Sequence, residues 1–249
     1  MLLHLSTWPE VERYLEQRRQ IIIPIGSTEQ HGPTGVIGTD CICPETIAVR
    51  AEQKCGVMVA PTFNVGVAQH HLAFAGTITL RPSTMAAVIS DWVSSLARHG
   101  FETIYFLNGH GGNVAPAQAA FAEIHAERSL GEAPQTRDKE LALLLRCWWD
   151  LPGVVELRQE LYGKAEGSHA TPAEIAVTQH AYAAAIRDAS TLTPEIAPSG
   201  SALVDAETYR ARFPDGRIGS NPALARPEDG QRLVEAASDA VVAELEQLR

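Results

Sequence analysis

The sequence has few cysteines and no paired cysteine motif. Its 249 residues include four cysteines, and none belongs to a Cys-x-x-Cys pair. A chain of this length buries roughly 70–75% of its unfolded surface on folding, so it needs no disulfide bonds for stability. We therefore interpret these residues as the reduced, buried thiols of a cytosolic protein. They are Cys41, Cys43, Cys55 and Cys147.

Long apolar segments are absent as well. The best candidate for a membrane span, residues 141–149, is short and contains Arg146, whereas a span needs about 20 apolar residues. Residues 1–19 lack the apolar core that a signal peptide carries. We therefore expect a cytoplasmic protein that has no membrane partner.

Positive charge is scarce and dispersed along the chain. There are 20 Lys and Arg residues against 30 Asp and Glu, which gives a net charge of −10. The basic residues form no stripe, and this argues against general nucleic-acid binding. The composition, 45% hydrophobic and 20% charged, is that of an ordinary globular protein. The chain shows no repeat and no break in composition, so we expect residues 1–249 to form a single domain.

Apolar strand-like runs alternate with helical segments along most of the chain. The predicted strands are residues 21–25, 57–61, 77–80, 103–107 and 141–149. The predicted helices are residues 8–19, 44–54, 82–99, 114–130 and 227–248, with a further one that begins at Thr171. Residues 191–221 are rich in Pro, Gly and Ser and are expected to be irregular. The alternation predicts an α/β fold with a mostly parallel sheet covered by helices on both faces.

The first candidate site lies in residues 21–40. A buried β-branched strand, residues 21–25, leads into a loop that holds Glu29, His31 and Asp40. Loops that follow buried strands commonly bind ligands in α/β folds, and imidazole with carboxylate suits Zn, Mn or Fe(II). Each residue alone also fits an ordinary solvated loop. Their combination at the end of a buried strand favours a metal site.

The second candidate site follows the predicted strand at residues 103–107. There the sequence reads Asn108-Gly109-His110-Gly111-Gly112-Asn113. Glycines beside the imidazole leave room for a substrate, and Asn113 can cap the next helix, whose amides would face the same crevice. The alternative is a plain strand-to-helix turn in which His110 is incidental. The position at a strand end favours the functional interpretation.

A third candidate group surrounds a predicted helix start. Thr171-Pro172-Ala173-Glu174 fits a capping box with proline at the first helical position. Helix capping alone is therefore enough to explain Glu174. His169, two residues before the cap, has no comparable structural reason to be there.

Taken together, these motifs resemble the creatininase (creatinine amidohydrolase) family. The resemblance rests on Gly26-Ser27-x-Glu29-Gln30-His31-Gly32-Pro33 with Thr39-Asp40, on the run from Asn108 to Asn113, and on His169-Ala170-x-x-x-Glu174. Phe74-x-Gly76-Thr77 and Gly219-Ser220-Asn221-Pro222 are similar to weaker family blocks, so the resemblance covers nearly the whole chain. It implies a three-layer α/β/α sandwich with a two-metal site, usually assembled into a hexamer.

The resemblance also implies a role for each candidate ligand. It places Glu29, Asp40 and His110 on one metal, and His31 with the shared Asp40 on the other. The second metal needs a further glutamate, which creatininase itself carries at the position of Gly112 in this sequence.

The departure at that position leaves Glu174 as the replacement, as in the family branch with the Asn-Gly-His-Gly-Gly-Asn motif. It also makes creatinine itself an unexpected substrate. His169 matches the catalytic histidine of the family. Each metal would then have three protein ligands and an open position, as catalytic sites require.

The activity that the resemblance implies is that of a metal-dependent amidohydrolase with two divalent ions, Zn or Mn with Fe as a further option. A hydroxide that bridges the metals would cleave a C–N bond in a linear or cyclic small-molecule amide, with His169 as proton shuttle. The alternatives are a formamide deformylase, a peptidase-like member, or a non-catalytic metal-binding or assembly protein. His70 or His71 can line the pocket, and so can Trp148 and Trp149, but all four also fit a packed, structural role.

Overall fold

Two apolar, β-branched segments form the centre of a four-stranded sheet. The strands are β1 (Gln20–Ile25), β2 (Met58–Val59), β3 (Thr103–Asn108) and β4 (Ala142–Cys147), in the order β2-β1-β3-β4. All three strand pairings in this sheet are parallel. The computed structural model describes residues 1–130 and 140–248.

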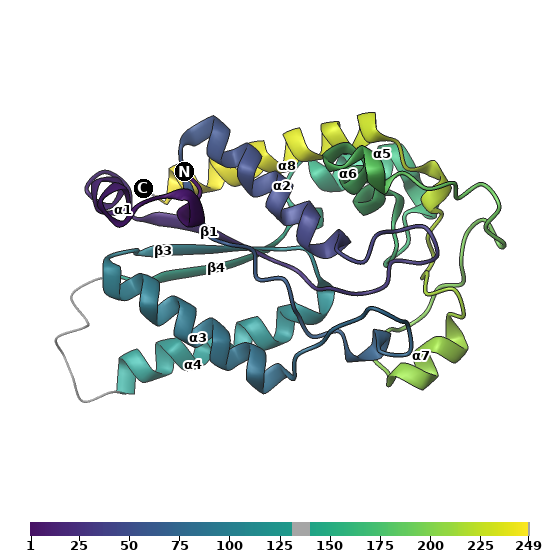
Figure 1. Ribbon diagram of the computed structural model, residues 1–249, viewed down its shortest axis with the longest axis horizontal. Coiled ribbons are helices and arrows are strands. Elements are labelled where there is room, and N and C mark those ends of the chain that lie inside the picture. The colour runs from purple at the N-terminus through teal and green to yellow at the C-terminus, as the bar shows by residue number, and fades with distance from the viewer. Residues whose placement is uncertain (131–139, 249) are drawn as a thin grey trace.

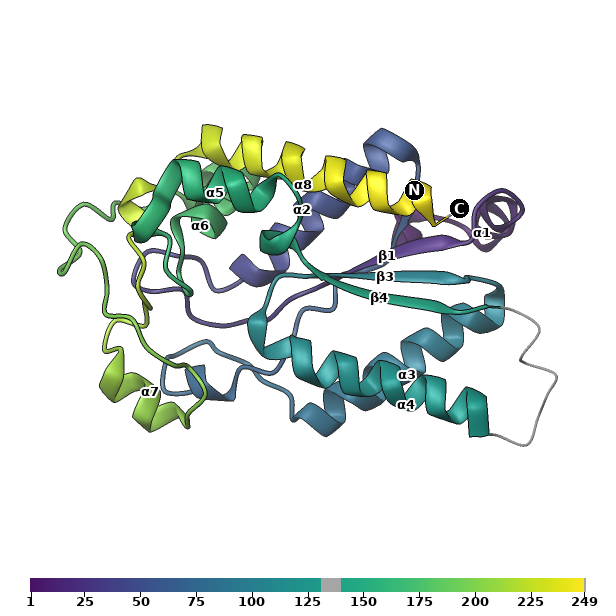
Figure 2. The same cartoon turned by 180° about the vertical axis from the view of Figure 1, so that it is seen from behind.

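Helices cover the sheet on both sides, which completes three layers (Figure 1). One layer contains α2 (Thr39–Cys55), α5 (Val154–Tyr162), α6 (Pro172–Ala181) and α8 (Pro227–Gln247), and the other contains α3 (Pro82–His99) and α4 (Val114–Leu130). Viewed from behind, α1 (Trp8–Leu15) lies near the start of β1, and α7 (Ala206–Arg212) lies beyond the opposite ends of the strands (Figure 2). The predicted α/β/α sandwich with a parallel sheet is confirmed.

Side chains of the central strands alternate between two hydrophobic cores. Ile22 and Tyr105 are register partners and belong to the core under α2 and α8. The next pair, Ile23 and Phe106, belongs to the core under α3 and α4. All four side chains are fully buried. A strand buried on both faces has no polar side, which is why the sequence shows continuous apolar runs here.

Some predicted elements are wrong in extent or type. Residues 77–80 are not a strand of the sheet, because Ile78 only forms an isolated antiparallel bridge with Thr28. The first helix ends at Leu15 instead of residue 19, because residues 16–19 form the turn into β1, which already begins at Gln20. The predicted strand at residues 141–149 ends at Cys147, and both tryptophans that follow lie in a 3₁₀ turn.

Two short helices were not predicted, although each begins with a readable cap. The α7 helix lies inside the segment predicted to be irregular, and the Asp205 side chain accepts a hydrogen bond from the Thr208 N–H at its start. At the start of α5, the Glu156 carboxylate accepts from the Gly153 N–H. Both helices are only two or three turns long, so their apolar periodicity is weak.

The α2 helix begins at Thr39, several residues before the predicted start at Pro44, which lies inside the helix. Asp40 therefore sits in the first helical turn and not in a loop. Because Pro44 has no N–H, the Asp40 carbonyl lacks its usual helical partner. That carbonyl lies against the end of β3, where a Cβ added to Gly109 would be only 2.0 Å from the oxygen. Gly109 thus allows the turn that carries Asp40 to rest on the strand end.

Replacing Gly109 by alanine is expected to destabilise the fold by about 1–3 kcal/mol, the usual range for overpacking. The matched control is Gly111→Ala, because a Cβ added there meets no atom within 4 Å. Chemical denaturation of both variants measures the difference. Equal stability of the two proteins would contradict the described packing of α2 on β3.

The four cysteines are free, but only two match the expected burial. Cys41 and Cys43 are buried in α2, whereas Cys55 and Cys147 are partly exposed. Burial raises the pKa of Cys41 to about 12, with a further contribution from Asp40. The Cys41 thiol is therefore protonated at neutral pH.

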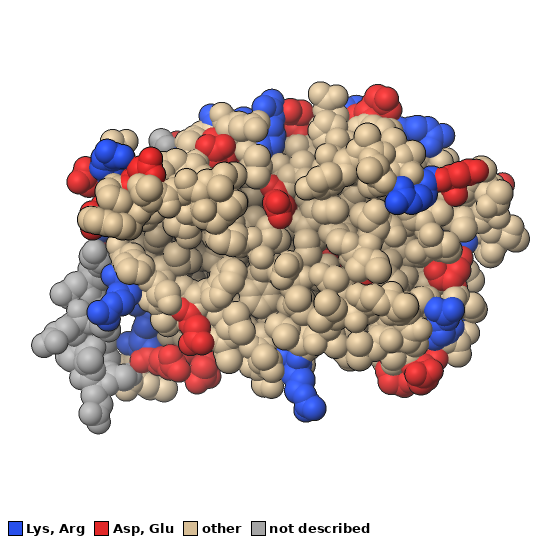
Figure 3. Space-filling view, viewed as in Figure 1, with Lys and Arg blue, Asp and Glu red and all other residues tan. Residues whose placement is uncertain are grey.

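On the face shown in Figure 3, Lys and Arg side chains are interspersed with Asp and Glu, and much of the face is uncharged. Within residues 1–130 and 140–248, no helix has the length and apolar character that crossing a membrane requires. The expectations about nucleic acid, oligomeric state and cellular location stay predictions.

Candidate metal centre

Four candidate side chains converge where β1 and β3 end. Glu29 and His31 lie on the loop after β1, Asp40 lies in the first turn of α2, and His110 directly follows β3. None of the four residues is more than 6% exposed. Nε2 of His31 lies 2.9 Å from Oδ1 of Asp40, and Nδ1 of His110 lies 3.0 Å from Oδ2. Asp40 therefore has one imidazole beside each of its oxygens, while Oε1 of Glu29 lies 3.3 Å from His110.

Three carboxylate oxygens in this cluster are buried without a hydrogen-bond donor. Among the residues that the structure describes, no donor with ordinary hydrogen-bond geometry reaches Oε1 or Oε2 of Glu29, or Oδ2 of Asp40. Buried polar atoms in this state are rare and costly. Ligand atoms of Glu29, His31 and Asp40 lie within 4.8 Å of one another. The donor set therefore fits a divalent cation, which would supply the missing partner.

The two imidazoles are oriented so that one nitrogen of each faces the carboxylates. Nδ1 of His31 lies 3.1 Å from the backbone carbonyl of Glu29, and Nε2 of His110 lies 3.0 Å from that of Val67. Donation to a carbonyl by one ring nitrogen fixes the ring and leaves the other nitrogen for a metal. This arrangement is typical of histidine ligands in metal sites.

Gly112 lies directly beside the His110 ring. A Cβ added there would be 2.2 Å from the carbonyl oxygen of Val67 and 2.5 Å from Nε2 of His110. The contact that orients His110 therefore depends on the absence of a side chain at position 112. On this backbone, a glutamate at that position has no room.

The pKa shifts reflect strong coupling between the buried charges. Burial raises the pKa of Glu29, but the charge of His110 outweighs this and holds it well below its usual range. Burial lowers the pKa of His31, yet the Asp40 carboxylate outweighs this and brings it to about 10. The carboxylates thus favour positive charge at both imidazoles, a role that a metal cation can also fill.

Glu174 serves the helix cap and faces the cluster at the same time. Its Oε1 accepts a hydrogen bond from the Thr171 N–H, and its own N–H donates to Oγ1 of Thr171, so the predicted capping box is confirmed. The other oxygen, Oε2, lies 3.8 Å from Nε2 of His31. Burial is the main reason that the pKa of Glu174 rises to about 7. The ligand role of Glu174 stays a prediction, but the capping role does not compete with it.

The two roles of Glu174 can be separated by a pair of variants. Glu174→Gln keeps an oxygen for the cap and removes the carboxylate, so we expect it to lose mainly one metal ion with little change in stability. Thr171→Val removes only the hydroxyl half of the cap, which should lower stability by about 1 kcal/mol and leave metal content unchanged. Elemental analysis and thermal unfolding measure both quantities. Full metal content in Glu174→Gln would show that the residue is only a cap.

His169 approaches the cluster from a strained segment. The residue after it, Ala170, has a φ of 52°, in the left-handed region that alanine rarely adopts. An antiparallel bridge between His169 and Ile218, and a hydrogen bond from Ser220 Oγ to the His169 carbonyl, hold this segment in place. Nδ1 of His169 lies 3.9 Å from Oε1 of Glu29. Burial lowers the pKa of His169 well below its usual range, so its ring is neutral at neutral pH.

Sequence reasoning left other contributors to the site undecided or misassigned. His71 is only 1% exposed and lies 3.2 Å from Oε1 of Glu29, whereas His70 lines a cavity next to it. The predicted cap role of Asn113 is wrong, because its side chain joins the loops instead, with bonds to Val67 N–H and the Gly26 carbonyl. The alternation of the sequence cannot show such contacts, since they join residues far apart in the chain.

Two cavities open beside the cluster, and His110 and His169 line both. One, of about 310 Å³, is also lined by Asp40, Glu174 and the two tryptophans at 148 and 149. The other, of about 250 Å³, is lined by Glu29 and His71. Trp148 is 2% exposed and packs in the core under α2, so it has a structural role as well.

Such a fold, with buried carboxylates and imidazoles at the strand ends, is that of an α/β/α metal-site protein. A family model described as creatininase, creatinine amidohydrolase, matches residues 4–245. The chain belongs to the creatininase family.

Curated relatives differ in what they act on. A mycofactocin precursor peptide peptidase of Mycobacterium ulcerans (strain Agy99) is 32% identical over 131 residues, which cover 49% of this chain and 48% of that protein. A creatinine amidohydrolase of Pseudomonas putida is 25% identical over 162 residues, 63% of this chain and 60% of that protein. The matches thus span about half to three-fifths of these relatives.

Solved structures match over nearly the whole chain. A mutant creatininase has a TM-score of 0.84 at 21% identity, over 99% of this chain and 97% of that chain. Other matching creatininase structures are described as Zn-Zn type and as Mn. At this level of identity the likeness shows the shared fold.

Proposed function

We propose that the protein is a metal-dependent hydrolase that cleaves the C–N bond of an amide-type substrate with two divalent ions. The main supporting observation is a group of three buried oxygens without a hydrogen-bond donor, both oxygens of Glu29 and Oδ2 of Asp40. His110 faces Oδ2 of Asp40 with Nδ1, and His31 faces the other Asp40 oxygen with Nε2. Zn, Mn and Fe(II) all suit this ligand set. Family membership supports the reaction class, and an assembly of identical chains is expected with it.

In this proposal, Asp40 would belong to both ligand sets. Glu29 and His110 would complete one set, and His31 and Glu174 would complete the other. The three carboxylates contribute a charge of −3 against +4 from two divalent ions. Because these charges nearly cancel, burying the cluster with its ions would cost far less free energy than burying the carboxylates alone.

The protein residues around the ions orient the substrate and move its proton. When bound, the ions supply an activated water and polarise the scissile carbonyl. His169, neutral because of its burial, has Nδ1 on the side of the cluster, where it can take up a proton and return it to the leaving nitrogen. The indole rings at positions 148 and 149 form an apolar wall for the substrate in the larger cavity.

A peptide substrate is the second candidate, and the arrangement of cavities favours it. Because His110 and His169 line cavities on two sides, a chain could extend in both directions from the scissile bond. The larger cavity also contains Arg158, which is paired with Glu166 at 2.8 Å and offers a cation for a terminal carboxylate. The similarity to a precursor peptide peptidase supports the same candidate.

The test is an activity screen combined with metal removal. The purified protein is assayed against creatinine, formamides, cyclic amides and short peptides, before and after exhaustive chelation. We expect turnover of at least one amide, loss of that activity on chelation, and recovery when Zn, Mn or Fe(II) is returned. Activity that is unchanged after exhaustive chelation would refute the metal mechanism. A fully metallated protein that hydrolyses none of these compounds would support a non-catalytic role.

A further inference from the structure

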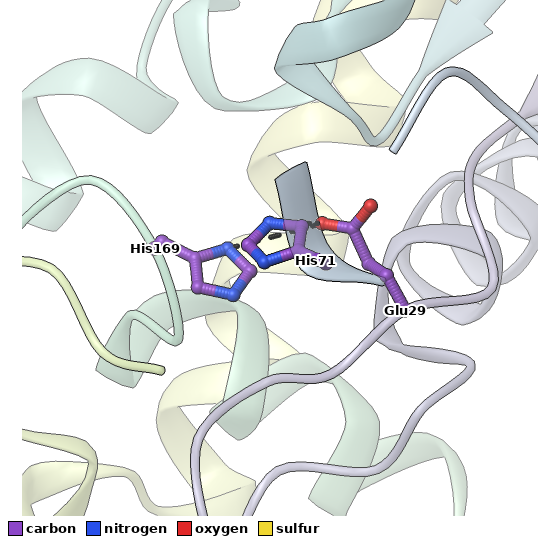
Figure 4. A group of neighbouring side chains, drawn as sticks. All are labelled: Glu29, His71 and His169. Atoms are coloured by element: carbon purple, nitrogen blue, oxygen red, sulfur yellow. Dashed lines mark ion pairs between the residues drawn. The ribbon is translucent and has the colours of Figure 1, made fainter. Parts of the chain in front are cut away.

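We infer that Gln30 fixes His71 with its proton on Nε2, facing Glu29, so that His71 positions this carboxylate and does not bind metal. The inference rests on the proposed metal centre and adds two positioning residues to it. It concerns a group of side chains, Glu29, His71 and His169, whose ligand atoms lie close enough together to hold an ion themselves (Figure 4). The hydrogen bonds of Gln30 decide whether His71 positions the Glu29 carboxylate or binds a metal ion itself.

Backbone groups on both sides fix the orientation of the Gln30 amide. Its Oε1 accepts a hydrogen bond from the Gly32 N–H at 2.8 Å, and its Nε2 donates to the Gly216 carbonyl at 3.1 Å. The amide lies flat against residue 216, where an added Cβ would be only 2.0 Å from Oε1. Exchanging the oxygen and nitrogen would lose both bonds and place a carbonyl against a carbonyl. The NH₂ group therefore points into the histidine cluster.

This orientation assigns the proton on His71. Nδ1 of His71 lies 2.9 Å from the Gln30 amide nitrogen, so Nδ1 must accept the hydrogen bond. A neutral imidazole that accepts at Nδ1 carries its proton on Nε2. That nitrogen lies 3.2 Å from Oε1 of Glu29, so an N–H faces the carboxylate (Figure 4). A nitrogen that carries a proton offers no lone pair to a metal.

The neighbouring histidine receives the opposite assignment. Nε2 of His169 lies 2.9 Å from the Gln30 amide nitrogen, as Nδ1 of His71 does, but that nitrogen has only two protons. We assign them to His71 and the Gly216 carbonyl, because Nε2 of His169 has an acceptor of its own. Nε2 of His169 lies 2.9 Å from the backbone carbonyl of Gln30 and donates to it. Nδ1 of His169 then keeps its lone pair on the side of Glu29, as a proton acceptor requires. One glutamine thus sets both rings, so that an N–H of His71 and a lone pair of His169 face Glu29.

Aromatic packing holds the His71 ring in this position. The rings of His71 and His169 stack at 4.5 Å with an interplanar angle of 23°, and Tyr209 packs edge-on against His71, also at 4.5 Å. The Tyr209 hydroxyl donates to the same Gly216 carbonyl that receives the Gln30 amide. Tyr209 of α7 therefore contacts both the His71 ring and the carbonyl that binds the Gln30 amide.

Nitrogen NMR of protein labelled in its histidine rings tests the assignment directly. In the metal-free protein we expect His71 to carry its proton on Nε2 and none on Nδ1, and to keep this state when Zn is added. The His71→Gln variant identifies its signals by their loss. In Gln30→Glu, a carboxylate replaces the donor, and the His71 proton should move to Nδ1. The inference would be overturned if His71 of the wild-type protein carried its proton on Nδ1, or if it lost the Nε2 proton when Zn binds.

Metal affinity provides a second readout with a matched pair of variants. A glutamine amide reaches the Nε2 position of histidine, whereas an asparagine amide reaches only the Nδ1 position. His71→Asn should therefore weaken Zn binding by about 10–100-fold in chelator competition, the range for groups that orient ligands, with stoichiometry unchanged. His71→Gln should stay close to wild type. Equal loss in both variants, or loss of a metal equivalent, would identify His71 as a ligand. If the wild type binds no metal, the proposed function fails, while the NMR result still decides the proton assignment.

Discussion

Replacing Asp40 by alanine is expected to remove both metal ions and to abolish hydrolysis. Asp40 has an imidazole within 3.0 Å of each oxygen, so it is the one side chain that both proposed ligand sets share. Its loss should lower activity by more than the roughly 100-fold effect of removing a group that only orients a ligand. Elemental analysis of the purified variant, together with the amide assay, measures both effects.

The control for this variant is Asp91→Ala, which removes an exposed carboxylate from α3 and should keep the wild-type metal content. Asp40→Asn adds a closer comparison, because it keeps the shape of the side chain and removes its charge. Two tightly bound ions in Asp40→Ala would show that Asp40 does not bridge the metals.

The second large effect is expected for His169→Ala, which should lower turnover by about 10²–10⁴-fold and leave both metals in place. The range is that of a lost general acid–base group. The metals are retained because His169 lies 3.9 Å from Glu29, beyond the contacts that Asp40 and His110 make. Steady-state kinetics on the best amide, with metal analysis of the same sample, separates the two effects.

His180→Ala is the matched control for this variant, since that imidazole is exposed at the end of α6. Unchanged turnover in His169→Ala would remove the residue from the mechanism. A missing metal equivalent would make it a ligand instead of a proton shuttle.

The centre of the sheet and the strand-end position of the ligands could be predicted because local sequence determines them. Residues 21–25 and 103–107 are continuous apolar runs, which only a strand buried on both faces or a buried helix explains. The residues that follow such strands meet at one edge of a parallel sheet. Glu29, His31 and His110 were placed correctly at this edge on that basis.

The remaining contacts depend on residues that are distant in sequence. Asp40 was expected in a loop because Pro44 suggested a later helix start, but the packing of the first α2 turn against Gly109 decides the observed start. The roles of Gln30 and His71 depend on Gly216, which lies in a segment predicted to be irregular surface. Hydrophobic periodicity carries no information about a hydrogen bond between residues 30 and 216.

Metal titration of the chelated wild-type protein tests the central claim most directly. The protein is stripped of metal, titrated with Zn or Mn, freed of unbound ions and submitted to elemental analysis. We predict two equivalents of divalent metal per chain, because two imidazoles and two glutamates surround one shared aspartate. A protein that binds no metal, or saturates at a single equivalent, would contradict the two-metal site.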